Sequence, residues 1–160
     1  MQNGYLEKKS NKIKLNIGCG RDYRKGWKNV DASREVKADE YYDIRNGIKE
    51  EENSCIEIYC SGVLEQILEN EKFLFVMNEL WRVLDPNGIA TIVVPSSRYA
   101  IAFRDPFDCR HFIEETWDYI DYNKKYYHLY GSVYGFKPWI VLEKTTNLRG
   151  IMTIVMRPLK

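Results

Sequence analysis

The sequence predicts an α/β fold, with a doubly wound, mostly parallel sheet of seven strands that ends in an antiparallel hairpin. Short apolar runs alternate with turn signals through the first hundred residues. Residues 89–94 form a continuous β-branched run, which is typical of a strand buried on both faces of a parallel sheet. Two further β-rich runs, at residues 139–143 and 151–156, are joined by a polar connection and predict the hairpin.

The remaining strands follow from the same pattern of apolar runs ended by turn residues. The first is an apolar run that leads into a glycine turn, the second and third are short and end in acidic segments, and the fourth precedes a Ser-Gly turn. These strands are expected at residues 13–17, 27–31, 38–44 and 56–60. With 160 residues, the chain is expected to form a single domain over residues 1–160.

The helices are expected in the second half of the chain. Residues 64–84 carry apolar side chains at helical spacing, and Asn70 and Glu71 are expected to interrupt them, so that a short helix precedes a longer one. Asp-Pro-Asn-Gly at residues 85–88 predicts a stop and a turn. Residues 113–122 are expected to form another helix.

Composition narrows the function classes. The net charge is +1, so no strong field attracts the protein to nucleic acid or to an anionic membrane. No apolar run approaches the roughly 18 residues that a membrane helix needs. Residues 1–11 are polar and expected to be flexible, and because they lack the apolar stretch of a signal peptide, a cytoplasmic location is expected.

The cysteines have no metal-binding or disulfide pattern. No Cys-x-x-Cys pair and no zinc spacing is present, so reduced thiols and no metal site are expected for Cys19, Cys55, Cys60 and Cys109. A catalytic role for Cys109 is disfavoured because no feature of the sequence lowers the pKa of its thiol.

The first strand runs into a Gly-x-Gly turn at Gly18 and Gly20, and the second strand ends at Asp31. Glycines let a ligand approach the backbone, and a carboxylate in this position accepts hydrogen bonds from ribose hydroxyls. This pairing predicts an adenosine site, although a Gly-x-Gly after a strand is also compatible with a simple tight turn.

The spacing of the glycines and the acidic residue distinguishes a dinucleotide from other cofactors that contain adenosine. A dinucleotide site needs a third glycine where this chain has Tyr23, and an acidic residue about 20 residues further on. Asp31 comes only 11 residues after Gly20, which leaves no room for a helix and a strand. We therefore expect the first crossover helix to be shortened or absent, and an NAD-linked enzyme is disfavoured.

Five blocks in order resemble the class I S-adenosylmethionine-dependent methyltransferases, and more narrowly the small type 11-like methyltransferase-domain proteins of bacteria and viruses. The blocks are residues 15–31, 43–45, 61–66, 80–88 and 105–112. The chain departs from the family pattern where Gly62 and Gln66 replace histidines and where Asn87-Gly88 replaces the usual glycine pair. The resemblance implies a Rossmann-like methyltransferase sheet and S-adenosylmethionine as the cofactor.

The resemblance also implies a set of cofactor-binding residues at the carboxyl ends of the strands. Asp31 would accept the ribose hydroxyls, Asp43 the adenine amino group, and the backbone of Ile44 would pair with a ring nitrogen. The alternative for Asp43 is a helix cap. The full set is Asn16, Gly18, Cys19, Gly20, Asp31, Ala32, Asp43, Ile44, Ser61 and Leu64.

Methyl transfer is an in-line displacement that depends mainly on alignment of the reacting atoms, and a hydroxyl acceptor also needs a base. The catalytic candidates are His111, whose unperturbed pKa lies near neutrality, and Asp108. Arg104 and Arg110 are candidates for substrate binding. The alternative is a structural clamp, in which His111 bonds to the backbone and Arg110 pairs with Asp105 or Asp108.

Residues 98–138 lie where this fold inserts acceptor-binding elements, and residues 117–139 are dense in tyrosine. Such rings could stack on a sugar or a base, contact a cation, form a lid, or make a homodimer contact. The sequence thus predicts methyl transfer to a small-molecule or sugar acceptor, with nucleic acid disfavoured. The alternative is a module on the same fold that binds the cofactor or a protein partner without chemistry.

Overall fold

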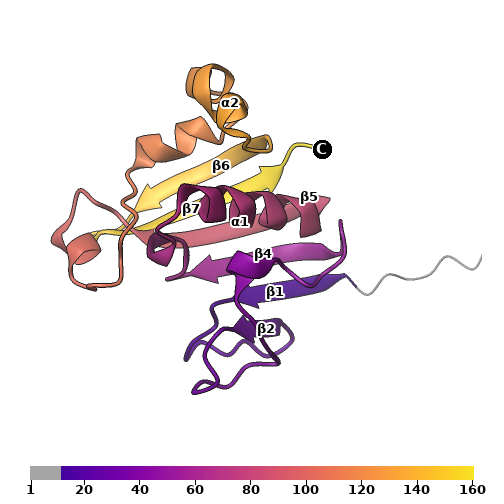
Figure 1. Ribbon diagram of the computed structural model, residues 1–160. Helices are drawn as coiled ribbons and strands as arrows, with labels where there is room; N and C mark the ends of the chain where they lie inside the picture. The colour runs from indigo at the N-terminus through magenta and orange to yellow at the C-terminus, as the bar shows by residue number, and fades with distance from the viewer. Residues whose placement is uncertain (1–11) are drawn as a thin grey trace, which may run out of the picture.

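The computed structural model describes residues 12–160 and is built on a seven-stranded sheet with the order β3-β2-β1-β4-β5-β7-β6 (Figure 1). The flexibility expected for residues 1–11 lies outside the described residues. The strands are β1 Ile13–Ile17, β2 Lys28–Asp31, β3 Glu40–Tyr41, β4 Cys55–Ser61, β5 Leu84–Pro95, β6 Trp139–Thr146 and β7 Ile151–Pro158. β1 to β5 pair in parallel, whereas β7 runs antiparallel to both β5 and β6. This topology confirms the predicted fold class and its terminal hairpin.

The helical segments are short apart from one α-helix. They are η1 Ile44–Asn46, η2 Leu64–Gln66, α1 Asn70–Val83, η3 Ala100–Phe103, η4 Glu114–Tyr119, the π-helical η5 Tyr127–Gly131 and α2 Ser132–Tyr134. The short-then-long helical pattern of residues 64–84 is confirmed, but Asn70 begins α1 rather than interrupting it. The helix expected at residues 113–122 is instead the 3-10 segment η4.

Two other boundaries correct the sequence prediction. The strand expected at residues 38–44 is reduced to Glu40–Tyr41, because the Asp43 side chain caps η1 and turns the chain there. The turn expected at residues 85–88 is a bulge within β5: the pairing with β4 jumps from Leu84 to Ile89. The Asp85 side chain accepts the Asn87 N–H at 2.9 Å and so stabilises the bulge.

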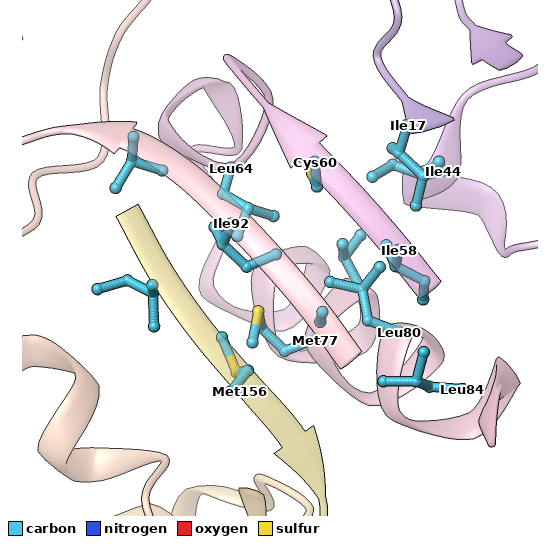
Figure 2. Packing of buried hydrophobic residues seen from close by; sticks show 14 of the residues in the cluster. Ile17, Ile44, Ile58, Cys60, Leu64, Met77, Leu80, Leu84, Ile92 and Met156 are labelled. Atoms are coloured by element: carbon cyan, nitrogen blue, oxygen red, sulfur yellow. The ribbon is translucent and has the colours of Figure 1, made fainter. Parts of the chain in front are cut away.

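The core lies between the sheet and α1, which crosses in front of β4 and β5 in Figure 1. Figure 2 shows Met77 and Leu80 of α1 among the buried side chains of the strands, which include Ile58, Ile92 and Met156. Each fully buried aliphatic side chain of this kind contributes about 1.5–3 kcal/mol relative to exposure. This layer therefore holds the central strands in place.

Burial alternates along β5, so the expectation that residues 89–94 are buried on both faces is wrong. Ala90, Ile92 and Val94 are fully buried, whereas Thr91 and Val93 are half-buried. Alternation of this kind is typical of a strand that packs firmly on one face only. Within residues 12–160, α1 is the only single helix longer than six residues, so a long helix packs on one face of the sheet and the other face is covered less completely.

The first crossover, residues 18–27, contains turns and no helix, as the spacing predicts. A buried pair of asparagines takes over the hydrogen bonding that a helix would provide. Asn16 Nδ2 donates to the Asp22 carbonyl at 2.8 Å and to Asn29 Oδ1 at 2.9 Å. Arg24 extends from this crossover over the sheet, with its guanidinium carbon 3.4 Å from the centroid of the Tyr59 ring.

Asn29 is the centre of this amide network and is completely buried. Its Oδ1 accepts the Arg24 N–H at 2.8 Å, and its Nδ2 donates to the Arg24 carbonyl at 2.9 Å and the Trp27 carbonyl at 3.0 Å. Asp39 Oδ2 accepts the Asn29 backbone N–H at 2.7 Å. The crossover is thus fixed by side-chain bonds to backbone rather than by a helical ladder.

No helix within residues 12–160 combines the length and the apolar character needed to cross a membrane.

We predict that Asn29→Ala lowers the free energy of unfolding by about 3 kcal/mol, because it leaves several buried polar groups without partners. Urea denaturation at neutral pH measures this. The control is Asn123→Ala, which alters an exposed asparagine and is expected to change stability by no more than about 0.5 kcal/mol. Equal effects of the two variants would show that the network does not hold the crossover.

Candidate cofactor site

A cleft of about 580 Å³ lies at the carboxyl ends of β1, β2 and β4. This is the edge at which open α/β sheets bind their ligands. The lining residues are Ile17, Gly18, Gly20, Val30, Asp31, Ala32, Tyr42, Asp43, Ile44, Arg45, Gly62, Val63, Gln66, Ile67 and Phe107. Six residues of the predicted cofactor set are among them: Gly18, Gly20, Asp31, Ala32, Asp43 and Ile44.

The backbone conformation of the first turn favours glycine at both Gly18 and Gly20. Gly18 has a φ of +63°, and a Cβ added there would stand 2.2 Å from Val63 Cγ2. Gly20 has a φ of +48°, a conformation that favours glycine. The turn therefore brings the backbone of β1 against the segment that follows β4, which forms the floor of the cleft.

Asp31 is tied to the glycine turn. Its Oδ2 accepts the Gly20 N–H at 2.8 Å, and its Oδ1 accepts the Ser33 N–H at 2.8 Å. Each carboxylate oxygen has a further lone pair with which to accept a ligand hydroxyl. Gly20 and Asp31 are thus close in the sequence and are also joined by a direct hydrogen bond, which orients the carboxylate.

Asp43 caps η1, which was one of the two alternatives that the sequence left open, and it also lines the cleft. Its Oδ1 accepts the Arg45 N–H at 2.9 Å, and its Oδ2 accepts from Arg45 Nη2 at 2.6 Å. The hydrogen bonds from the Arg45 side chain lower the pKa of Asp43, so this carboxylate stays ionised.

Four residues of the predicted cofactor set do not line the cleft. Asn16 lies beneath the crossover, and Leu64 is part of the core. Cys19 is buried with its Sγ 3.5 Å from the Lys37 carbonyl, and burial raises the pKa of its thiol. Ser61 is half-buried at the end of β4. All four cysteines are free.

Sequence reasoning missed several residues that line the cleft. Arg45, Val63 and Gln66 lie inside blocks that carried the resemblance, so these blocks were the signal for them. Phe107 lies within the last block but is not one of its matched residues, which are Asp105, Pro106 and residues 110–112. It is 78% exposed, and it reaches the cleft from the segment after η3.

Glu65 is a buried carboxylate next to residues that line the cleft. It lies inside the matched block of residues 61–66, but the sequence analysis assigned it no role. The residue is 4% exposed, and its Oε2 has no hydrogen-bond partner within residues 12–160. Burial is the main cause that raises the pKa of Glu65 to about 7, and the charges of Asp108 and Asp105 raise it further.

The segment that carries the predicted catalytic residues is fastened to Glu65 through the backbone. The N–H groups of Cys109 and Arg110 each donate to the Glu65 carbonyl at 2.9 Å. Arg110 Nε donates to the Ile67 carbonyl at 3.0 Å, and Nη2 donates to the Leu68 carbonyl at 3.0 Å. Arg110 thus clamps this segment onto the chain before α1.

The partners of Arg110 differ from those that the sequence suggested, which were Asp105 or Asp108. No ion pair joins Arg110 to Asp105 or Asp108 in the part of the chain that the structure describes. The pairing suggested as an alternative is therefore wrong, because the guanidinium is used by backbone carbonyls. Its carbon also lies 4.3 Å from the centroid of the Phe73 ring.

The other acceptor-side candidates lie around the cleft rather than in its lining. His111 is exposed, with its ring centroid 5.0 Å from that of Phe103, and Arg104 is exposed on the same segment. Asp108 is half-buried, and burial together with the charge of Asp105 raises the pKa of Asp108.

A second cleft of about 850 Å³ lies between α1 and residues 113–136. Its aromatic wall includes Tyr119, Tyr126 and Tyr134, and Tyr130 stacks beside them. We call these four residues the tyrosine cluster. Their rings are close to parallel, with centroids between 5.2 Å (Tyr119–Tyr126) and 6.4 Å (Tyr119–Tyr134) apart.

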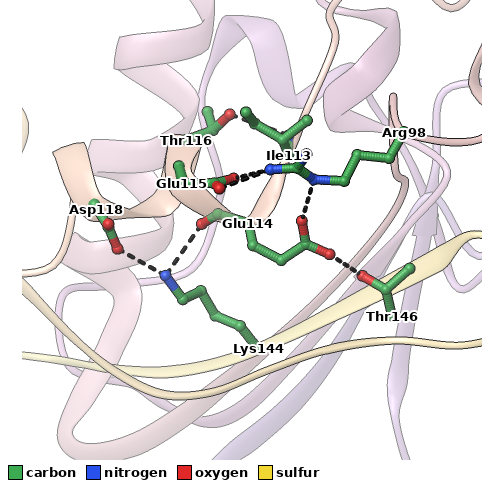
Figure 3. Close-up of polar contacts among 8 residues, drawn as sticks. All are labelled: Arg98, Ile113, Glu114, Glu115, Thr116, Asp118, Lys144 and Thr146. Atoms are coloured by element: carbon green, nitrogen blue, oxygen red, sulfur yellow. Dashed lines mark hydrogen bonds and ion pairs between the residues drawn. The ribbon is translucent and has the colours of Figure 1, made fainter.

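Ion pairs hold the η4 wall of this second cleft onto the sheet. Figure 3 shows Arg98 between Glu114 and Glu115, and Lys144 of β6 beside Asp118. Arg98 Nη2 lies 2.6 Å from Glu115 Oε1, and Lys144 Nζ lies 2.7 Å from Asp118 Oδ1. The pairs bridge three segments, so η4 is fixed relative to the sheet.

We predict that Glu65→Gln changes the pH dependence of stability. Because the folded protein holds the Glu65 proton up to a pKa of about 7, wild-type stability falls as pH rises from about 4.5 to 7, by up to about 3 kcal/mol. The glutamine variant lacks this loss, so above pH 7 it is expected to be the more stable protein. Denaturant unfolding at pH 5 and 8 measures the difference, and parallel profiles would contradict it.

The sequence matches no protein-family model and no curated protein. Solved structures, however, share its fold. An S-adenosylmethionine-dependent methyltransferase from Archaeoglobus fulgidus superposes with a TM-score of 0.63 at 12% identity, over 91% of this chain and 86% of that chain. One from Clostridium acetobutylicum gives 0.62 at 13% identity, over 92% and 84%. One from Methanosarcina mazei gives 0.55 at 15%, over 91% of both. The chain therefore has the fold of the class I S-adenosylmethionine-dependent methyltransferases.

Proposed function

We propose that this protein transfers a methyl group from S-adenosylmethionine to a small-molecule or sugar acceptor. The observation that carries the proposal is the cleft at the carboxyl ends of β1, β2 and β4, in which Asp31 is hydrogen-bonded to Gly20 of the glycine turn. The likeness in fold to methyltransferases supports the same conclusion.

The cleft residues fit a cofactor that carries ribose and adenine but no phosphate. Asp31 would accept the ribose hydroxyls, and Asp43 with the Ile44 backbone would face the adenine. The glycine turn would contact the methionine portion. A phosphate group is best bound by a helix N-terminus, but turns follow Gly20 instead. This supports S-adenosylmethionine over a dinucleotide.

The bound cofactor would supply an electrophilic methyl group on a positively charged sulfur. The chain's own contribution would be alignment, because an in-line displacement needs the reacting atoms about 3 Å apart in the right geometry. Val63 and Gln66 line the cleft together with Phe107, which belongs to the segment after η3, and these side chains would exclude water there. For a hydroxyl acceptor, His111 assisted by Asp108 is the proposed base, and Arg104 the proposed substrate contact.

Residues 98–138 are the proposed acceptor side, and the second cleft gives them a surface for a ring-shaped ligand. A homodimer contact through the exposed tyrosines and a cytoplasmic location stay predictions. The rival function is a module that binds the cofactor without chemistry. It is favoured by the position of His111 outside the cleft lining and by the use of Arg110 as a clamp.

We predict that S-adenosylmethionine and its demethylated product S-adenosylhomocysteine bind to this protein in calorimetric titrations and that NAD does not. Asp31→Asn is expected to weaken binding at least about tenfold, since one oxygen remains for Gly20 but the charge is lost. Glu35→Gln, an exposed residue of the next loop, is the control and is expected to bind normally. Failure of both adenosyl ligands to bind would refute the proposed function.

We predict that His111→Ala lowers methyl transfer to a hydroxyl acceptor by about a hundredfold and leaves affinity for S-adenosylmethionine unchanged, as expected for a base that does not hold the cofactor. A screen of acceptors with labelled methyl groups, followed by kinetics of the variant, measures this. Unchanged turnover would remove His111 from the mechanism.

A further inference from the structure

The helical turns between η4 and β6 expose most of their apolar side chains. η5 and α2 follow each other without a break, and only Tyr127 and Gly131 of this run are buried. Gly131 permits the close approach, because a Cβ there would stand 1.8 Å from the Tyr119 carbonyl oxygen. The other large apolar side chains recur at helical spacing and are exposed. We call them the exposed stripe: Tyr126, Leu129, Tyr130, Val133 and Tyr134.

The exposed stripe is held in place at the edge of the molecule. Figure 1 shows α2 beyond β6, at the opposite end of the sheet from β2. Asn78 of α1 fastens the end of the helical run, since its Nδ2 donates to the Gly135 carbonyl at 3.0 Å and its Oδ1 accepts the Lys137 N–H at 3.0 Å. Val133 is nevertheless 77% exposed. A group of large apolar side chains that is fixed and exposed typically marks an interaction surface.

The segment that carries the stripe is positively charged. Residues 122–138 contain Lys124, Lys125 and Lys137 but no acidic residue, so the net charge of +1 for the whole chain conceals a local excess. None of these lysines forms an ion pair in the described part of the chain. Asp121, directly before the segment, is 4% exposed and accepts the Asn123 N–H.

The neighbouring second cleft neutralises little of this charge. Two carboxylates line it, those of Glu71 in α1 and Glu115 in η4. Glu115 is bound to Arg98, at 2.6 Å between its Oε1 and Nη2. The exposed stripe is therefore flanked by more positive than negative charge, and its partner is expected to be both apolar and anionic.

We propose that the exposed stripe and its lysines dock this protein on an anionic lipid bilayer. The inference goes beyond methyl transfer and does not depend on it. Leu129 and Val133 would enter the boundary between head groups and acyl chains, and the tyrosine rings would lie at the level of the head groups. Lys124 and Lys125 would contact the lipid phosphates, because anionic lipids attract lysines near the membrane surface.

Other occupants fit these observations less well. The tyrosine rings stack on one another, with centroids 6.3 Å apart for Tyr126–Tyr130 and 6.4 Å apart for Tyr130–Tyr134, so their faces are less available to the bases of a single-stranded nucleic acid. A second copy of this chain, docked through the same stripe, would bring the lysines of both copies together. A bilayer satisfies the apolar and the charged groups at once.

Vesicle flotation with the full chain tests the docking surface. We expect the protein to float with vesicles of phosphatidylserine and phosphatidylcholine, to bind phosphatidylcholine alone at least about tenfold more weakly, and to be released by high salt. The variant Lys125→Gln/Val133→Ser removes one cation and one aliphatic side chain, and it is expected to bind the anionic vesicles at least about tenfold more weakly.

The matched control is Leu148→Ser/Arg149→Gln, which removes the same two kinds of side chain from the exposed turn between β6 and β7. It is expected to bind vesicles like the wild type. Circular dichroism is expected to be unchanged in both double variants, because all four side chains are exposed. The comparison of anionic with neutral vesicles uses the wild type alone, so it decides the question even if a variant does not fold.

Several outcomes would overturn the inference. They include no flotation of the wild type with anionic vesicles, equal binding to both kinds of vesicle, and equal effects of the two double variants. Dimerisation in sedimentation measurements that Lys125→Gln/Val133→Ser abolishes and the control keeps would instead assign the stripe to a second copy. Tighter binding of polyuridylate than of vesicles, lost in the same variant, would assign it to nucleic acid.

Discussion

The structure depends on one buried amide network, in which Asn16 and Asn29 replace a helix. Without a crossover helix, the chain after β1 must reach β2 through turns, and turns leave backbone groups without a ladder of partners. Asn29 supplies those partners for Arg24 and Trp27, and Asn16 fixes Asp22. These bonds fix the turns of a short crossover, in which the Gly20 N–H donates to Asp31 and orients its carboxylate.

The same constraint explains which parts of the fold follow from the sequence. The short spacing between Gly20 and Asp31 is a local property, so the absence of the first crossover helix could be predicted from the number of residues between them. The positions of most strands along the chain and the terminal hairpin also follow from apolar runs that each lie within a few residues. Burial of β5 on one face could not be predicted in this way, because it depends on which other segments form a covering layer.

The residues of the candidate site can also be sorted into those that the sequence predicts and those that it does not. Gly18, Gly20, Asp31 and Asp43 lie at strand ends, where sequence patterns place them directly. Glu65 lies in a matched block, but its burial could not be predicted, because the segment that bonds to its backbone, at Cys109 and Arg110, is distant in the sequence. Likewise, the residues that Arg110 binds could not be predicted, because backbone carbonyls have no signature in a sequence.

The carboxylates at the two ends of the cleft differ in whether they have partners within the protein. At the end of the cleft formed by β2 and η1, Asp43 is paired with Arg45, and Asp31 is stabilised by two backbone N–H groups, so both carboxylates are satisfied without a ligand. At the other end, Glu65 Oε2 has no hydrogen-bond partner within the described residues. A preformed, neutralised half suits a cofactor that binds first. At the β4 end, burial raises the pKa of Glu65 to about 7, so this carboxyl keeps its proton at lower pH and is neutralised without a cationic partner.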